Sequence, residues 1–288
     1  MAPKEAEEAN DQDLTDKLDS LTIQDKKNDS KPVEYTSEEI KAIKEVYQNL
    51  IQTKNIEAKR IGLRSLALVT IVSKLRIEEA SDKYVKLLSA LKLCQLDSLE
   101  ATDTQVEELM QDKDVLEVMK AYASSGRDSE NRSIFWIQGN AKGYPPDMEK
   151  AYCHGGLLYW LAIHADDISI HEGVTFIIDT SATSMDLKYG NEKKLQKLNQ
   201  AFPMRPQTIK LAGASRIKRI LINGLIRVAS LFTKQKILDR IQFVSVEEAV
   251  NSIPKESAPR YLGGGGGGIE DMNQWITDRV LSLPIPTL

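Results

Sequence analysis

Several short motifs contain residue types that could support catalysis, but each lacks part of the pattern that the chemistry needs. The six glycines at 263–268 could cradle a phosphate, yet no Gly-Lys-Ser or Gly-Lys-Thr follows, so a flexible linker is the simpler interpretation. The tripeptide at 213–215 (Gly-Ala-Ser) begins like the nucleophile elbow of a hydrolase but lacks the second glycine. Neither Cys94 nor Cys153 has an arginine six positions later, which excludes the phosphate-binding loop of a cysteine phosphatase.

Asp179 is the remaining candidate for a catalytic residue, because it ends a predicted strand. Functional carboxylates often project from that position in α/β folds. Thr180 and Ser181 supply turn chemistry, so an aspartate that caps the following loop is the simpler interpretation. The two cysteines and three histidines show neither a disulfide framework nor metal-ligand spacing. We therefore expect a protein that is not an enzyme and that has no catalytic residue, no metal site and no cofactor.

The charge is distributed unevenly along the 288 residues, although the net charge is only −4. Residues 1–35 hold ten acidic and five basic side chains, whereas residues 205–240 hold nine basic side chains and one acidic one. Such a basic stretch indicates an anionic surface as partner. We expect no nucleic acid as partner. Without a long apolar run or a basic leader, the sequence predicts a cytoplasmic protein, for which any membrane association is transient and peripheral.

The chain divides into three parts by composition and periodicity. Residues 1–32 are polar and acidic, and they predict a disordered tail. Residues 36–124 predict a helical lobe, which begins with the capping-box spacing of Thr36 and Glu39 and continues with helices at 56–74, 78–93 and 102–123. Residues 126–282 predict an α/β domain. Its expected strands are 133–138, 174–179, 208–212 and 240–244, and its expected helices are 147–165, 191–201 and 215–232.

The predicted helix at 215–232 is amphipathic and has a basic edge. Periodicity alone fits an ordinary core helix with one solvated face. Asn223 and Gly224 in its middle weaken the helix, which would suit a segment that bends or moves. Both interpretations remain open at this point.

The order of motifs over residues 66–280 resembles the CRAL-TRIO lipid-binding family. The resemblance rests on six segments: 75–80 (LRIEEA); Gly126, Asp128, Arg132, Ser133 and Ile134 before the first strand; 173–179 (GVTFIID); 202–205 (FPMR); 232–241; and 253–264. Asn131 and Ser133 depart from the family's Gly-Arg-Pro-Val sequence, and the last segment is stretched by extra residues and glycines. The resemblance implies an N-terminal helical lobe followed by an α/β/α domain whose mainly parallel sheet encloses a hydrophobic pocket.

The same resemblance implies a function and a set of site residues. The protein would bind one hydrophobic lipid in an internal pocket gated by the helix at 215–232, and it would carry or present that lipid at anionic membranes. A non-catalytic scaffold of the same fold, which binds a protein partner, is the alternative. The residues assigned to the lipid pocket are Trp136, Phe176, Ile178, Leu221, Leu225, Val228 and Phe232.

Departures from known relatives narrow the expected ligand. Val174 and Phe176 stand where phosphatidylcholine-binding relatives have hydroxyl residues, and Met204 stands where phosphatidylinositol-transfer relatives have glutamate. Arg205, Lys236 and Arg240 match three positions of the basic cleft with which tocopherol- and retinoid-type relatives bind phosphoinositide headgroups, while Gln207 replaces a fourth. These matches favour a nonpolar ligand. We assign anionic headgroup binding to Arg205, Lys236, Arg240 and Lys74.

Overall fold

The computed structural model describes residues 35–93, 109–121, 126–138, 146–163, 167–181, 200–203, 205–215 and 239–265. Several expected features lie outside these residues. They are the tail at 1–32, the start of the helix at 102–123, most of the helix at 191–201, and the helix at 215–232 beyond its first residue.

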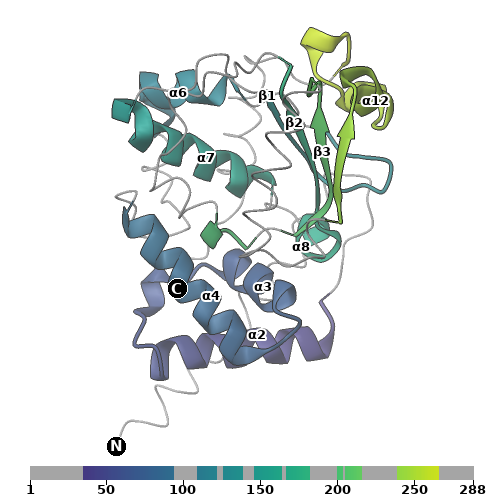
Figure 1. Cartoon of the computed structure of the whole chain (residues 1–288). Coiled ribbons are helices and arrows are strands. Elements are labelled where there is room, and N and C mark those ends of the chain that lie inside the picture. The colour runs from purple at the N-terminus through teal and green to yellow at the C-terminus, as the bar shows by residue number, and fades with distance from the viewer. Residues whose placement is uncertain are drawn as a thin grey trace, which may run out of the picture.

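The N-terminal lobe is helical, as its periodicity predicts. It consists of α2 (Ser37–Gln52), the short 3-10 helix η2 (Ala58–Arg60), α3 (Leu63–Val72) and α4 (Ile77–Leu93), at the bottom of Figure 1. The predicted capping box is confirmed, because the Glu39 amide donates to the Thr36 hydroxyl at 3.2 Å and the Thr36 amide donates to the Glu39 carboxylate at 2.8 Å. Thr36 therefore fixes where the first helix of this lobe begins.

The single helix predicted at 56–74 is interrupted at Gly62. The backbone of Gly62 is extended, and its amide donates to the Tyr84 hydroxyl at 2.7 Å instead of to a helical carbonyl. That hydroxyl in turn donates to the Arg60 carbonyl at 3.3 Å. A tertiary contact from α4 thus divides the segment into η2 and α3, which local propensity does not reveal.

The second half of the described chain contains one four-stranded sheet. Its strands are β1 (Ile134–Gln138), β2 (Val174–Asp179), β3 (Pro206–Ala212) and β4 (Ile241–Val244), in the order β1-β2-β3-β4, and each neighbouring pair is parallel. All four predicted strands are present, with ends that shift by at most two residues. The predicted fold class, a helical lobe followed by an α/β domain with a mainly parallel sheet, is confirmed.

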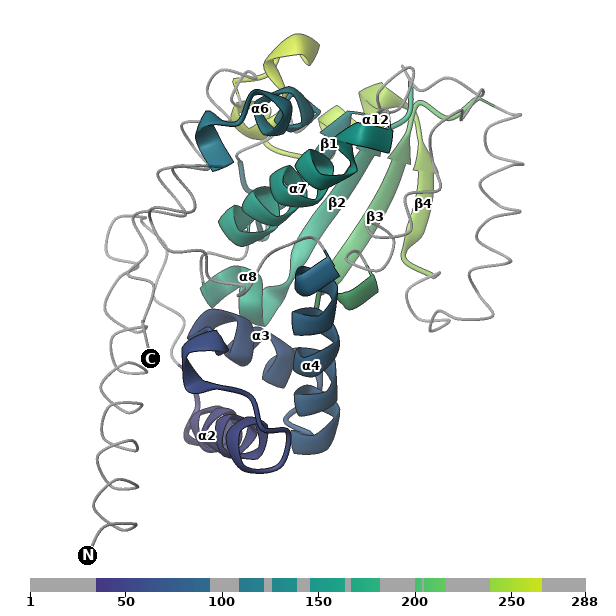
Figure 2. The same cartoon turned by 90° about the vertical axis from the view of Figure 1, so that its left-hand side faces the viewer.

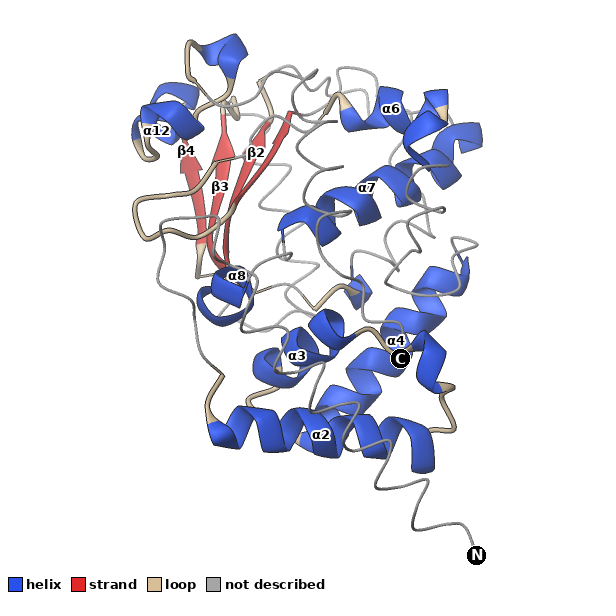
Figure 3. Cartoon of the chain, turned by 180° about the vertical axis from the view of Figure 1, so that it is seen from behind, coloured by secondary structure: helices blue, strands red, loops and turns tan. Residues whose placement is uncertain are grey.

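Helices cover both faces of this sheet. On one face, α7 (Glu149–Ile163) follows the short helix η3 (Pro146–Met148) and packs beneath α6 (Lys113–Met119). On the other face lie α12 (Val246–Asn251) and the short helices η4 (Lys255–Ser257) and η5 (Arg260–Leu262). Figure 2 shows α7 in front of β1 and β2, and Figure 3 shows α12 beside β4 from behind. The arrangement is a three-layer α/β/α stack.

Two described α-helices were not expected from the sequence, namely α8 (Asp167–Glu172) and α12. The second carried a readable signal. The Ser245 hydroxyl accepts a hydrogen bond from the Glu248 amide at 3.0 Å, and the Glu248 carboxylate accepts one from the Ser245 amide at 2.6 Å. This is the same capping box that Thr36 and Glu39 form, so the spacing of Ser245 and Glu248 could have revealed α12.

The helical lobe and the α/β half share one apolar core. Cys153, Leu157 and Trp160 of α7, with Ile170 and Phe202, belong to the same buried cluster as the apolar faces of α2, α3 and α4. The rings of Trp160 and Phe202 stack at a centroid distance of 4.8 Å. Apolar packing therefore crosses the predicted boundary between residues 124 and 126, and the division into 36–124 and 126–282 stays a prediction.

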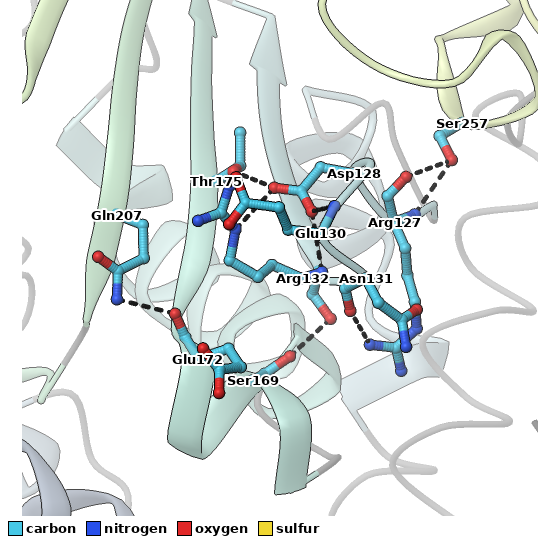
Figure 4. A network of polar contacts seen from close by, with 11 residues as sticks. Arg127, Asp128, Glu130, Asn131, Arg132, Ser169, Glu172, Thr175, Gln207 and Ser257 are labelled. Carbon is cyan, nitrogen blue, oxygen red and sulfur yellow. Dashed lines mark hydrogen bonds and ion pairs between the residues drawn. The ribbon is translucent and has the colours of Figure 1, made fainter. Parts of the chain in front are cut away.

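The turn before β1 is built around the carboxylate of Asp128 (Figure 4). One oxygen of this carboxylate accepts the amides of Glu130 and Arg132, each at 2.9 Å. The other oxygen accepts the Thr175 hydroxyl at 2.6 Å and Nε of Arg132 at 2.8 Å. Since Thr175 lies on β2, this one side chain fixes the turn, its arginine and the neighbouring strand together.

The environment of Asp128 favours its charged form. Burial alone would raise the pKa of this carboxyl, but the hydrogen bonds from Thr175 and Arg132 and the positive charge of Arg132 outweigh it and hold the pKa below its ordinary value. A depressed pKa means that the interaction stabilises the fold above the ordinary aspartate pKa of about 3.9. That stability is lost as the pH falls through the lower, folded-state pKa.

Asp128→Ala should lower the free energy of unfolding by about 3 kcal/mol at pH 7, because it removes the buried carboxylate that pairs with Arg132 and leaves this largely buried guanidinium only the exposed Glu130. Urea denaturation from pH 7 to pH 3 should show a gap to wild type that stays constant down to about pH 5 and closes below about pH 4. Asp112→Ala is the matched control, since Asp112 is an exposed N-cap of α6 whose loss costs about 1 kcal/mol. Equal losses in the two variants would contradict the assignment.

Candidate functional site

Two rows of apolar side chains cross one face of the sheet in register. Each row takes one residue from every strand, because residues paired in a parallel sheet point to the same face. The first row is Phe135, Phe176, Ile209 and Ile241, and the second is Ile137, Ile178, Leu211 and Phe243. Together they form a continuous apolar surface over four strands, which we call the apolar floor.

The floor is packed unevenly. At the β1 end, the Phe135 ring contacts Tyr159 of α7 at a centroid distance of 4.8 Å and Phe176 at 4.5 Å. Towards β4, Ile209, Ile241 and Phe243 are only partly buried. The structure therefore places Phe176 and Ile178, both predicted as pocket residues, on the apolar floor. This floor extends over more strands than the sequence suggested.

Trp136 does not lie on this floor, and its assignment to the pocket is wrong. It pairs with Ile177, whereas its neighbour Phe135 pairs with Phe176, so Trp136 faces the opposite layer. There it is fully buried in the cluster that includes Ala249 of α12 and Ile253. The physical reason is the two-residue repeat of a strand, which places adjacent side chains on opposite faces.

Six floor residues were missed from the sequence: Phe135, Ile137, Ile209, Leu211, Ile241 and Phe243. For the last four the signal was present, because apolar residues alternate with polar ones in 208–212 (TIKLA) and 240–244 (RIQFV). This alternation is typical of strands with one apolar face. Leu221, Leu225, Val228 and Phe232, the predicted roof of the pocket, lie outside the described residues.

Arg205 and Arg240 lie at the same edge of the sheet, before the amino ends of β3 and β4. The Arg205 guanidinium donates to the carbonyl of His171 at the end of α8, and the Arg240 guanidinium donates to the carbonyl of Pro206. Their own carbonyls accept the amides of Val174 and Ile209. Both cations are therefore oriented by backbone contacts, and each stands immediately before one of two neighbouring strands.

The remaining basic residues stand apart from this edge. Lys74 is exposed in the turn between α3 and α4, where its φ is 54°, and the contacts described for the structure do not join it to Arg205 or Arg240. Lys236 lies outside the described residues. Gln207, which replaces the fourth basic position, donates to the Glu172 carbonyl at 2.8 Å.

Asp179 caps a loop, as its sequence context indicated. One carboxylate oxygen accepts the Ser181 amide at 2.9 Å, and the other accepts the Tyr261 hydroxyl at 3.0 Å. Within the described ranges, His, Cys, Asp and Glu side chains form no group of three that could hold a metal ion. A helix long and apolar enough to cross a membrane is likewise not found in the part of the chain that the structure describes.

Comparison with known proteins identifies a family. The family model described as CRAL/TRIO domain matches residues 118–264, just over half of the chain. The matched segment runs from the end of α6 through all four strands to the glycines after η5. A search of curated proteins found no match.

Gly173→Ala should lower the free energy of unfolding by roughly 3 kcal/mol or more. Its φ is 80°, and an added Cβ would lie 2.2 Å from the Arg205 carbonyl oxygen, so both strain and a clash arise where β2 and Arg205 meet. Gly263→Ala is the matched control, because Gly263 has the same φ with no atom within 4 Å of the added Cβ. It should cost only about 1–2 kcal/mol in the same urea denaturation. Equal losses of unfolding free energy in the two variants would show that the Arg205 carbonyl does not pack tightly against Gly173.

Proposed function

Because the chain belongs to the CRAL/TRIO domain family, a lipid-binding and lipid-transfer family, we propose that it binds one nonpolar lipid against the apolar floor. The observation that carries the proposal is the register of the floor. Eight apolar side chains from four strands face one way, and those towards β4 are only partly buried by the protein. Apolar surface of this kind gains about 25 cal/mol for each Å² that a ligand removes from water.

The side chains of the apolar floor favour a ligand that places no polar headgroup against them. On β2 the floor consists of Phe176 and Ile178, and Val174 precedes them on the same face; none of these side chains can hydrogen-bond a polar group. The hydroxyl residue of that strand, Thr175, points to the opposite face and donates to Asp128. A nonpolar cargo would therefore leave no polar group unpaired.

We propose further that Arg205 and Arg240, together with Lys236, bind anionic lipid headgroups while the protein delivers its cargo. Arg205 and Arg240 stand immediately before two adjacent strands at the amino-terminal edge of the sheet, and Arg205 contacts the end of α8. Each guanidinium carries five N–H donors, so bonds to carbonyls leave further donors for phosphate oxygens. The function is then non-catalytic transport or presentation of a lipid at anionic membranes.

The lipid site is tested by two adjacent substitutions on β4. Ile241 pairs with Ile209 on the floor, whereas Gln242 pairs with Lys210 on the opposite face and is exposed. Ile241→Asp should lower lipid affinity by at least about a hundredfold, because an ionised carboxylate on the floor costs about 3 kcal/mol or more. Gln242→Asp, with the same charge one residue away, should bind lipid like wild type. Native mass spectrometry of the purified proteins measures the bound lipid.

This pair is preferable to a charge at Phe176, because the Phe176 ring also packs on Phe135 and its loss would disturb the fold. Thermal denaturation of both β4 variants checks that they remain folded. Lipid retention in a folded Ile241→Asp protein would place the ligand elsewhere. Wild-type protein without any bound lipid, from its own host or after incubation with lipid extract, would favour the protein-binding scaffold instead.

Membrane docking is tested with anionic vesicles. Replacing Arg205, Lys236 and Arg240 by alanine should weaken binding by about 3 kcal/mol, roughly a hundredfold, at about 1 kcal/mol for each charge. The control replaces Lys41, Lys59 and Lys120, which are exposed and paired with glutamates elsewhere, and changes the net charge equally. Sedimentation at low and high salt should show the attraction fading in wild type as the screening length shortens. Equal loss in both triple variants would mean that only net charge matters.

A further inference from the structure

A polar contact at the carboxyl ends of the strands joins three segments that are far apart in sequence. The indole N–H of Trp136, on β1, donates to the Tyr261 hydroxyl at 3.1 Å. The Tyr261 hydroxyl donates in turn to the Asp179 carboxylate, at the end of β2. Trp136 is fully buried and Asp179 is 1% exposed, so one hydroxyl serves as partner for two buried polar groups.

The residue that supplies this hydroxyl is itself at the surface. Tyr261 is 46% exposed, the largest exposure among the large apolar side chains of the described residues. It belongs to η5, within a segment of residues 259–265 that we call the strap. In Figure 1 the yellow-green end of the chain, which includes the strap, lies at the carboxyl ends of the strands. The surface ring thus reaches inward only through its polar tip.

The backbone hydrogen bonds of the strap close on the segment itself and on η4. The amides of Leu262 and Gly264 donate to the Pro259 carbonyl, that of Gly263 to Arg260, and that of Gly265 to Lys255. Gly263 ends η5 with a φ of 80°, and Gly264 packs so closely on the Ala258 carbonyl that a Cβ would lie 2.1 Å from its oxygen. The first two glycines of the run therefore shape the strap instead of acting as a plain linker.

We propose that the two hydrogen bonds of the Tyr261 hydroxyl hold this strap closed, and that the strap opens as a unit from the carboxyl ends of the strands when they break. We call this hydroxyl the lock. Opening would uncover the Asp179 carboxylate and the apolar cluster around Trp136 and Ile177. Open α/β sheets bind ligands at the carboxyl ends of their parallel strands. A strap that opens and closes there would therefore control whether a ligand can reach this edge of the sheet. The lock is independent of the apolar floor and of its cargo.

The hydrogen bonds of the Tyr261 hydroxyl contribute more to holding the strap closed than the burial of its other residues does. Leaving the Trp136 N–H and one carboxylate oxygen of Asp179 without a partner in a buried site is costly, and a hydrogen bond to a charged group is stronger than one between neutral groups. Beyond Pro259, which is buried, the strap contributes little burial, since Arg260, Tyr261, Gly263 and Gly265 are exposed and Leu262 and Gly264 are only partly buried. A single 3-10 turn does not persist once it is detached. Opening therefore frees the strap amides to exchange.

Tyr261→Phe tests the lock, because it keeps the ring and removes only the hydroxyl. Hydrogen exchange followed by mass spectrometry should show the amides of residues 262–265 exchanging about tenfold faster, a factor that corresponds to about 1.4 kcal/mol. Trypsin should cleave after the exposed Arg260 faster by a similar factor. Exchange in α4 and in the floor strand β4 should stay at wild-type rates.

Tyr84→Phe is the matched control, because it removes a hydroxyl that also makes two hydrogen bonds, with Gly62 and Arg60 in the helical lobe. It should speed exchange near Gly62 and leave the strap unchanged. Asp179→Asn keeps the shape of the acceptor and removes its charge, so it should loosen the strap less than Tyr261→Phe. The double variant should loosen it no more than Tyr261→Phe alone, since the two residues share one contact.

Three results would overturn the proposal. The first is strap exchange in Tyr261→Phe within twofold of wild type. The second is a rise in exchange of equal size over the whole chain, which would indicate general destabilisation. The third is full additivity of Tyr261→Phe and Asp179→Asn. If Tyr261→Phe fails to fold, Asp179→Asn alone decides, because an unchanged strap in that variant would contradict the lock.

Discussion

The register of the sheet depends on the carboxylate of Asp128. Its four hydrogen bonds close the turn before β1, hold Arg132 and reach Thr175 on β2. The turn and the first strand pair are thus fixed by one charged group, and β1 then runs beside β2 with Phe135 opposite Phe176. A slip of one residue would exchange the two faces of β1. It would place Trp136 on the apolar floor and break the continuity of both apolar rows.

The two faces of the sheet differ because of this register. The floor is apolar along its whole length, which suits a nonpolar ligand. The opposite face changes character along the strands. Thr175, near the amino end of β2, and Lys210, which pairs with Ile177, lie close to Asp128 and Arg132, and burial lowers the pKa of Lys210 although Asp128 opposes this. Near the carboxyl ends, Ile177 and Ala212 pack under α12. Polar contacts therefore set the register, and apolar packing holds the outer helix layer.

The two edges of the sheet also differ in the way their polar groups are used. At the amino-terminal edge, Arg205 and Arg240 donate to backbone carbonyls, and each guanidinium has further N–H donors. At the carboxyl-terminal edge, Asp179 and Trp136 are enclosed and share the hydroxyl of Tyr261. One edge therefore carries two cations, while the other is closed by the hydroxyl of a surface residue.

The sequence by itself determined what depends on neighbours along the chain. The box at Thr36, the four strands and the cap at Asp179 are local hydrogen-bond and periodicity patterns, and the motif order identified the family. Only the tertiary structure decided the face of Trp136, because strand 134–138 is apolar on both sides and gives no alternation to read. It also decided the break at Gly62, made by Tyr84, and the contact of Tyr261 with Asp179, 82 residues away. Such contacts depend on packing between distant segments, and no local pattern encodes which distant partner a polar group finds.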